Sequence, residues 1–221
     1  IFSPSKLQNH NISLSKGTED GSFFTSITYT EQDGIVAPEK SYFDRITARF
    51  NSTSKINDYL TFGQNVSVVG SKSSSIPENN EFGTPIGDAI AYDPITPVYD
   101  ENSQFGFAQS PFVQKEYVNP LSRVFINNGR QESFSIFGNT YLEVEPFDWL
   151  KVRSDIAINQ YTNRRNNYSP AYELTPAFQN LSSDVLQENE GGFQWQWENY
   201  FTINQKFGKN SFEFVGGTTA I

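Results

Sequence analysis

The chain has 221 residues, of which 36% are hydrophobic and 15% aromatic, and its formal net charge is -9. This acidic balance argues against a nucleic-acid-binding protein, which needs a basic face. Cysteine is absent and His10 is the single histidine, which excludes disulfides and most zinc or Ser-His-Asp chemistry.

The hydrophobic residues occur in short stretches, and the mean hydropathy is -0.53. No apolar run approaches the ~20 residues that a membrane-spanning helix needs, and this rules out an α-helical membrane protein. A transmembrane β-barrel is compatible with this composition, because only every second residue of a barrel strand faces lipid.

Four strands are predicted in the first third of the chain, where apolar and polar residues alternate with period two. They cover about residues 9–16, 22–30, 43–55 and 59–70. In the third strand, Ile46, Ala48 and Phe50 share one face. Arg45 and Arg49 lie on the opposite face, which is therefore predicted to carry charge.

A loop rich in proline and aromatic residues is predicted next, over residues 71–132. Its length exceeds that of ordinary connections and favours a functional loop, and its aromatic content indicates that it packs on itself. Tyr92, Tyr99, Phe105 and Phe107 are the candidates for gripping a sugar ring or a peptide side chain. The alternative is that these rings form the small core of the loop itself.

Four more strands are predicted after this loop. They cover about residues 133–144, 149–160 and 193–207 and a segment that begins at 211. Their polar face carries further charges that, with Arg45 and Arg49, we expect to line a lumen or meet a plug domain: Glu143, Lys151, Arg153, Asp155 and Glu198. Ion pairing is the favoured role, because unpaired charges in a packed interior are costly, and direct contact with substrate is the alternative.

Short and long connections alternate along these eight strands. The short ones are residues 17–21, 57–58, 145–148 and 208–210, and the long ones are residues 31–42, 71–132 and 161–192. Outer-membrane β-barrels have short periplasmic turns and long extracellular loops, and several strands reach the ~10 residues that a tilted barrel strand needs. The pattern predicts an all-β fold, an antiparallel transmembrane β-barrel segment with three extracellular loops.

A set of short motifs follows the same layout. They are EQDGI at 31–35, RITARFN at 45–51, INDYL at 56–60, PITPVYD at 94–100, NPL at 119–121, GNTYL at 138–142, DWLKVR at 148–153 and WQWENY at 195–200. In order and spacing they resemble the barrel of SusC/RagA-type TonB-dependent transporters of Bacteroidetes, and the similarity spans essentially the whole chain.

This resemblance implies a twenty-two-stranded barrel in the bacterial outer membrane, filled by an N-terminal plug and energised through the TonB complex. It also implies a SusD-like surface lipoprotein as an extracellular lid, and oligosaccharides or peptides as substrates. We expect residues 1–221 to be an internal piece of such a barrel domain, about eight of its strands, with the plug and the remaining strands outside this chain.

Two other function classes compete with transport. The first is a soluble all-β carbohydrate-binding module whose loop aromatics stack on sugars. The second is an extracellular enzyme, which is disfavoured because no catalytic constellation is present. The carboxylates of the long loop, such as Asp88, Asp93, Asp100 and Glu101, are expected to be solvated rather than to form an acid/base pair or a calcium site. No enzyme activity, cofactor or metal is therefore predicted.

Overall fold

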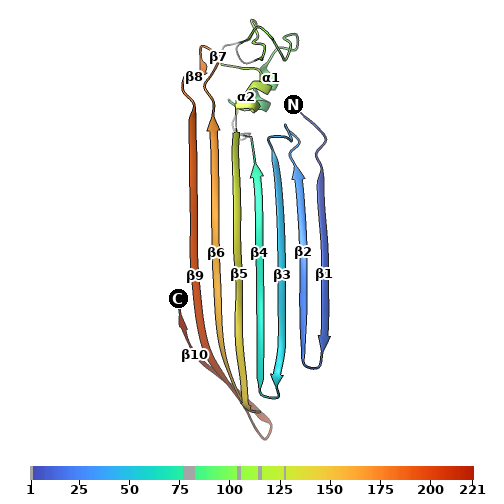
Figure 1. Ribbon diagram of the computed structural model, residues 1–221, viewed down its shortest axis with the longest axis vertical. Helices are drawn as coiled ribbons and strands as arrows, with labels where there is room; N and C mark the ends of the chain where they lie inside the picture. Colours follow the sequence, from blue (N-terminus) through green and yellow to red (C-terminus); the bar gives the residue numbers. More distant parts are fainter. Residues whose placement is uncertain (1, 77–82, 104–105, 114–115, 127) are drawn as a thin grey trace.

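The computed structural model describes residues 2–76, 83–103, 106–113, 116–126 and 128–221, and most of them lie in one tall sheet (Figure 1). Eight antiparallel strands follow one another in the order β1-β2-β3-β4-β5-β6-β9-β10. Their bounds are β1 Leu7–Thr18, β2 Gly21–Asp33, β3 Tyr42–Asn57, β4 Leu60–Ser74, β5 Asn128–Phe147, β6 Leu150–Ser169, β9 Asp184–Phe207 and β10 Asn210–Ala220. β1 and β10 are the two edges, and within the described residues they do not pair with each other. The sheet is thus open, as expected for a segment of a larger barrel.

All short connections lie at one end of the sheet and all long ones at the other (Figure 1), which confirms the predicted topology. The short turns use residues that close them locally. The backbone N–H of Tyr59 donates to the Asn57 side chain at 3.1 Å, and Gly208 has a φ of 59°, a left-handed conformation that glycine adopts without strain. Local chemistry therefore defines this end of the sheet.

The predicted strand boundaries were too short on the long-loop side. β6 runs on to Ser169 and β9 begins at Asp184, so that much of the predicted loop 161–192 is paired strand. These extensions are polar on both faces and give no apolar alternation to detect. Between them lies a small hairpin, β7 (Tyr172–Thr175) and β8 (Phe178–Asn180).

The longest connection contains two helices that the sequence pattern did not reveal, α1 (Pro85–Ala91) and α2 (Pro120–Ile126). α1 begins at Thr84, whose hydroxyl accepts from the backbone N–H of Gly87, with Pro85 at the first helical position. Both helices have seven residues. No helix in the described residues is both long and apolar enough to cross a membrane.

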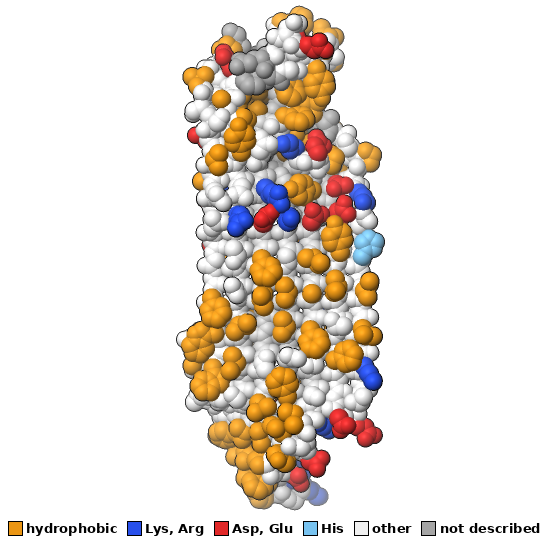
Figure 2. Space-filling model, viewed as in Figure 1, with side chains coloured by type: hydrophobic (Ala, Val, Ile, Leu, Met, Phe, Trp, Pro, Cys, Tyr) orange, Lys and Arg blue, Asp and Glu red, His pale blue; other side chains and the backbone are white. Residues whose placement is uncertain are grey.

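The two faces of the sheet differ in chemistry, as predicted. The cross-strand partners Phe62 and Leu142, and likewise Val68 and Ile136, lie on one face, which Figure 2 shows as a broad field of hydrophobic side chains. Most of these apolar residues stay exposed in the chain; Ile156, for example, is 53% exposed. Exposed apolar area on this scale requires another apolar phase or surface to cover it.

The buried apolar residues lie mainly outside the sheet. Val36, Ala37, Ile76 and Val124 form a core cluster with Ile86 packed against it. These residues come from the β2–β3 connection, the end of β4 and the two helices, so the long connections meet in one packed cap at the end of the sheet. A further tie is the Lys40 ammonium, which donates to the Asn128 side chain at 2.5 Å.

Candidate functional site

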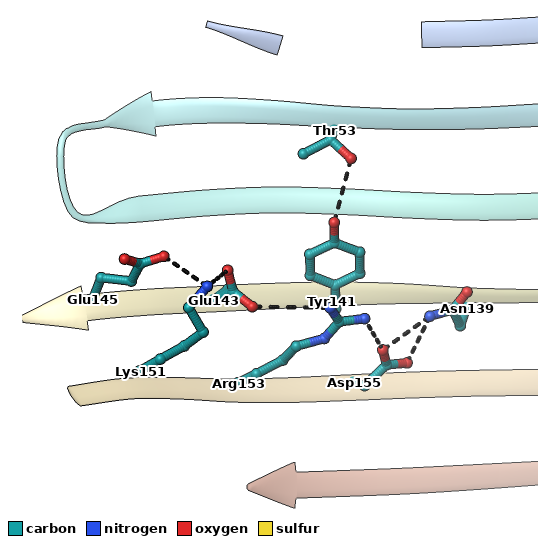
Figure 3. Close-up of polar contacts among 8 residues, drawn as sticks. All are labelled: Thr53, Asn139, Tyr141, Glu143, Glu145, Lys151, Arg153 and Asp155. Carbon is teal, nitrogen blue, oxygen red and sulfur yellow. Dashed lines mark hydrogen bonds and ion pairs between the residues drawn. The ribbon is translucent and has the colours of Figure 1, made fainter. Parts of the chain in front are cut away.

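The polar face of the sheet carries a network of charges built on β5 and β6 (Figure 3). The Lys151 ammonium lies 3.1 Å from Glu143 and 2.9 Å from Glu145. The Arg153 guanidinium lies 2.8 Å from Asp155 and 3.9 Å from Glu143. Glu143 and Arg153 are cross-strand partners, so that the register brings the opposite charges together. The network has three carboxylates for two cations and is locally acidic.

Arg153 is also held between two aromatic rings. Its guanidinium carbon lies 3.5 Å from the ring centroid of Tyr141 and 6.0 Å from that of Tyr200, within the range of cation–π attraction. Its Nε atom is buried and has no hydrogen-bond partner in the described part of the chain. A buried donor without a partner is costly, so this face is expected to receive a polar group from outside the described residues.

Tyr141 occupies space that a glycine leaves open. A Cβ atom built on Gly63, its cross-strand partner, would lie 2.1 Å from the Tyr141 ring. The Tyr141 hydroxyl reaches across β4 to the Thr53 hydroxyl on β3 at 3.3 Å (Figure 3). The small residue on β4 therefore lets the ring lie flat along the face and support Arg153.

Amides extend the network along the same face. The Asn139 side chain donates to both carboxylate oxygens of Asp155 at 2.9 Å, and Asn65 donates to Asn139 at 3.1 Å. The amide of Gln196 donates to Glu198 at 2.6 Å. These contacts link β4, β5 and β6 and place a separate amide–carboxylate pair on β9.

The predicted lumen or plug-facing residues share this face but do not form one cluster. Glu143, Lys151, Arg153 and Asp155 are joined in the network, whereas Glu198 is the cross-strand partner of Asp155 and bonds to Gln196. The two arginines of β3, Arg45 and Arg49, lie further toward the long connections and are exposed. The described residues include no group of three or more His, Asp or Glu side chains that could hold a metal ion.

A second candidate site lies in the cap of long connections. Asp88 of α1 and Arg123 of α2 form a buried ion pair, with side chains 1% and 7% exposed. The Arg123 guanidinium also lies 4.2 Å from the ring centroid of Phe178 in β8, and Phe178 packs against Tyr172 at 5.2 Å. The expectation that Asp88 is solvated is therefore wrong, because the paired helices enclose it and Arg123 neutralises it.

Tyr92 forms hydrogen bonds inside this cap. Its hydroxyl donates to the backbone carbonyl of Ala108 at 3.1 Å and accepts from the backbone N–H of Ser110 at 2.7 Å. The buried Asn119 amide donates to the carbonyls of Val98 and Ala108 at 2.7 and 3.1 Å. Both side chains add hydrogen bonds to loop backbone whose own strand pairing, within the described residues, is limited to a short bridge between Tyr99 and Phe107.

The other loop aromatics are divided between packing and exposure. Phe107 lies between Tyr99 and Phe125, with ring centroids 5.8 and 5.6 Å away. Tyr99 is 63% exposed, so it keeps a free face at the outer surface of the cap. Phe105 lies outside the described residues. Tyr99 is thus the predicted contact residue that remains most accessible.

The acid–base properties of two loop residues follow from these contacts. Burial raises the pKa of the Tyr92 phenol, and the backbone hydrogen bond from Ser110 opposes that shift. Hydrogen bonds from Ser110 and Thr96 hold the pKa of the Asp93 carboxyl below its ordinary value. Asp93 therefore stays ionised and accepts from the Thr96 backbone and hydroxyl at 2.8 and 3.0 Å.

Arg123, Asn119 and Tyr141 escaped prediction. The first two precede or lie within a helix too short for a periodic pattern, although Asn119-Pro120 carries a turn and helix-start signal. Tyr141 belongs to the GNTYL motif but was not predicted as a site residue, because its contact with Arg153 depends on the pairing of β5 with β6.

Comparison with known proteins identifies relatives of this chain. No protein-family model matches it. A TonB-dependent receptor of Formosa agariphila is 24% identical over 95% of the chain, which covers 20% of that receptor. The TonB-dependent receptor SusC of Bacteroides thetaiotaomicron is 23% identical over 98% of the chain and 23% of SusC. The chain thus spans about a fifth to a quarter of the length of these curated relatives.

Solved structures show the same fold. The RagAB peptide importer in its closed-closed state superposes with a TM-score of 0.70 at 16% identity, over 98% of this chain and 24% of the matched chain. Another structure of the RagAB peptide transporter gives a TM-score of 0.72 at 15% identity, over 99% and 24%. The resemblance in the sequence is confirmed: the relatives of this chain are TonB-dependent receptors that include SusC, and its open eight-stranded sheet matches the fold of part of the RagAB chain.

Proposed function

We propose that this chain is part of an energy-coupled outer-membrane importer of oligosaccharides or peptides that works with a SusD-like lipoprotein lid. The observation that carries the proposal is the combination of two unlike faces with connections sorted by length. One face is apolar and exposed (Figure 2), and the other carries an ion-pair network (Figure 3). Every long connection lies at one end of the sheet (Figure 1). A barrel wall needs all three features.

The same observation weighs against the soluble carbohydrate-binding module. A soluble sandwich covers its apolar face with a second sheet, whereas Ile12, Ile46 and Ile156 are between 53% and 78% exposed here. Lipid is the phase that covers such a face in an outer-membrane barrel. The apolar face is therefore assigned to the bilayer and the charged face to the lumen.

We assign the network around Arg153 to contact with the plug domain. The network has two cations and three carboxylates, and the buried Nε atom of Arg153 has no hydrogen-bond partner among the residues that the structure describes. These features suit a polar surface packed against the network. The pair of Arg153 and Asp155 is the more enclosed part of the network, with side chains 22% and 13% exposed. Arg45 and Arg49, which are exposed, are the better candidates for meeting solutes in the lumen.

The cap is assigned to the substrate and the lid. Tyr99 presents an exposed ring, and Ile90, Ile95 and Phe112 are each at least 69% exposed in the same long connection. Exposed aromatic and aliphatic residues of this kind mark binding surfaces. The internal packing of Tyr92 and Phe107 holds the surface in shape rather than contacting the ligand.

Growth on defined media tests the proposal. Cells that lack the gene are compared with the parent on a mixture of oligosaccharides as the carbon source and on a mixture of peptides as the nitrogen source. We expect a deficit on one of them, matched by loss of TonB. Equal growth on both media, with the receptor present in the parental outer membrane, would contradict the proposal.

A matched pair of loop variants tests the role of the cap. Tyr99→Ala should reduce uptake while the amount of receptor in the membrane stays the same. Tyr92→Ala should reduce the amount of folded receptor, because it removes two hydrogen bonds to loop backbone. Unchanged uptake in the Tyr99 variant would remove its ring from the binding surface.

A further inference from the structure

A row of charged side chains crosses the apolar face of the sheet near its long-loop end (Figure 2). The register places Asp44 of β3 opposite Lys72 of β4, Lys72 opposite Glu132 of β5, and Glu132 opposite Arg164 of β6. Asp44 is two residues from Ile46 in β3, and Glu132 is two residues from Phe134 in β5. Side chains two residues apart in a strand point to the same face, and Ile46 and Phe134 belong to the apolar face. The row therefore faces the bilayer side and not the lumen.

The apolar band below this row has the height of a membrane. Val152 and Thr162 are ten steps apart along β6, which is about 33 Å along a strand. A strand tilted by about 40° covers roughly 25 Å of that along the membrane normal, the usual height of the apolar band. The charged row thus lies at the level of the lipid headgroups, in the leaflet on the long-loop side.

A groove opens in the apolar face directly beneath the row. It has a volume of about 520 Å³ and is lined by Tyr29, Ile46, Gly70 and Phe134, with Asp44, Lys72, Glu132 and Arg164 at its charged end. Tyr29, Ile46, Gly70 and Phe134 are successive cross-strand partners on β2 to β5. Gly70 contributes no side chain between Ile46 and Phe134, and this gap forms the floor of the groove.

Of the charged side chains of this row around the groove, two cations and one carboxylate, Asp44, form no ion pair within the described residues. The row as a whole has four cations and three carboxylates: Lys6, Lys72, Arg130, Arg164, Glu31, Asp44 and Glu132. Glu31 is paired with Lys6 at 3.6 Å and Glu132 with Arg130 at 2.5 Å. In the described part of the chain neither Lys72 nor Arg164 lies within 4.0 Å of a carboxylate, and Arg164 bonds only to the Asn189 amide. The row is therefore cationic in a chain of net charge -9.

We propose that this groove binds a phosphorylated, acylated glycolipid of the outer leaflet, with an acyl chain between Tyr29 and Phe134 and a phosphate on Lys72 and Arg164. The charged end of this apolar cleft carries two cations and one carboxylate that form no ion pair in the described part of the chain, and this cationic excess matches a molecule with an apolar chain and an anionic head. Guanidinium and ammonium groups are the standard partners of phosphate. The charged row lies on the long-loop side, which assigns the lipid to the outer leaflet. This assignment rests on the membrane orientation given under the proposed function.

The groove can be filled without disturbing the fold. A Cβ atom on Gly70 would meet only the Ile46 side chain, at 3.6 Å, which is an ordinary contact. Gly70→Leu should therefore occupy the acyl-chain cleft and leave the strand paired. Lys72→Glu and Arg164→Glu change exposed side chains and should reverse the charge of the phosphate site with little effect on folding.

Lys16 provides a matched control. It lies on the same face as Lys72, is exposed, and has no ion pair in the described residues, but it sits at the short-turn end of the apolar band. Lys16→Glu makes the same change of charge in the opposite leaflet. Any general effect of a charge reversal on the purified receptor will appear in this variant as well.

The experiment measures lipid bound to the complete receptor by native mass spectrometry in detergent. The probes are diphosphorylated lipid A, the same molecule with its phosphates removed, phosphatidylglycerol and inorganic phosphate. We expect lipid A to bind, and its affinity to fall at least about tenfold in Lys72→Glu and in Gly70→Leu. The Lys16→Glu variant should match the unaltered receptor, and inorganic phosphate alone should not displace the lipid.

Each other outcome overturns the inference. Equal binding of lipid A by all variants removes the site, and stronger retention of phosphatidylglycerol assigns the groove to a different lipid. A change in the number of receptor copies per particle in Gly70→Leu would assign the groove to a second copy of the chain. Lipid binding in detergent does not depend on import, so failure here and failure of the proposed transport function are distinguishable.

Discussion

Replacing Ile156 with arginine is the sharpest test of which face of the sheet meets lipid. Ile156 lies in the middle of β6, between Val152 near the short turn and Thr162 near the charged row. It is the cross-strand partner of Thr140 and Trp197, and its side chain is 53% exposed in the chain. In the membrane this position lies near the centre of the apolar band.

The expected cost follows from the depth of the position. Arginine on the lipid face of a barrel costs about 2–4 kcal/mol at the bilayer midplane and about 0–1 kcal/mol near the interfaces. A loss of 2–4 kcal/mol lowers the folding equilibrium constant roughly 30- to 700-fold. The neighbouring residue Ala157 faces the charged side, where it is the cross-strand partner of Asn139. Arginine at Ala157 should therefore cost much less.

The assay is folding of the complete receptor into phospholipid vesicles over a urea series, with the folded fraction read from a heat-modifiable gel shift. The Ile156→Arg variant should need less urea to unfold than Ala157→Arg. Equal costs, or a larger cost at Ala157, would show that the two faces are assigned the wrong way round, because a shift of one residue in register exchanges them.

Three further predictions concern the loop and the polar face. Arg123→Met leaves the Asp88 carboxylate buried without a cation and should cost about 3–5 kcal/mol of local stability, measured as faster hydrogen exchange across both loop helices. A double variant that also carries Asp88→Leu should recover most of the lost stability. Gly63→Ala should displace the Tyr141 ring, since its Cβ would lie 2.1 Å away. The loss of contact between the ring and the network should lower the midpoint of thermal unfolding. In a chain that already carries Tyr141→Ala, the same change should lower the midpoint little further. The pKa of Asp93 is lowered in the folded loop. Its contribution to stability is therefore present above its ordinary pKa and is lost as the pH falls through the lowered value. Hydrogen exchange of the loop should accelerate on acidification, and Asp93→Asn should weaken that pH dependence.

The strand pattern of the sheet was readable from local sequence. Alternation around Ile46 and Arg45 assigned both residues to their faces because side chains in a strand point to opposite sides in turn. The eight strands and the alternation of short and long connections followed from the same reading. The ends of β6 and β9 were missed, because beyond about residue 161 both faces are polar and the pattern loses its contrast.

The candidate site was predicted only as a set of residue types on one face. That Lys151 pairs with two glutamates depends on which residues of β5 and β6 lie opposite each other, whereas Arg153 and Asp155 are two residues apart on one face of β6. The contact between Arg123 and Phe178 joins segments 55 positions apart in the numbering. The pairs of Lys151 therefore follow from strand register, and the contact of Arg123 with Phe178 follows from the packing of distant segments.

By itself, the sequence determined the all-β class, the two faces, the positions of the turns and the family resemblance, since each depends on residues that are neighbours along the chain. The tertiary structure decided how far the strands extend, that the long connection folds into helices, that Asp88 is buried, and that Gly70 opens a groove beneath Lys72 and Arg164. These features arise from cross-strand register and from the packing of connections far apart in sequence, where contact is set by the whole sheet and not by local pattern.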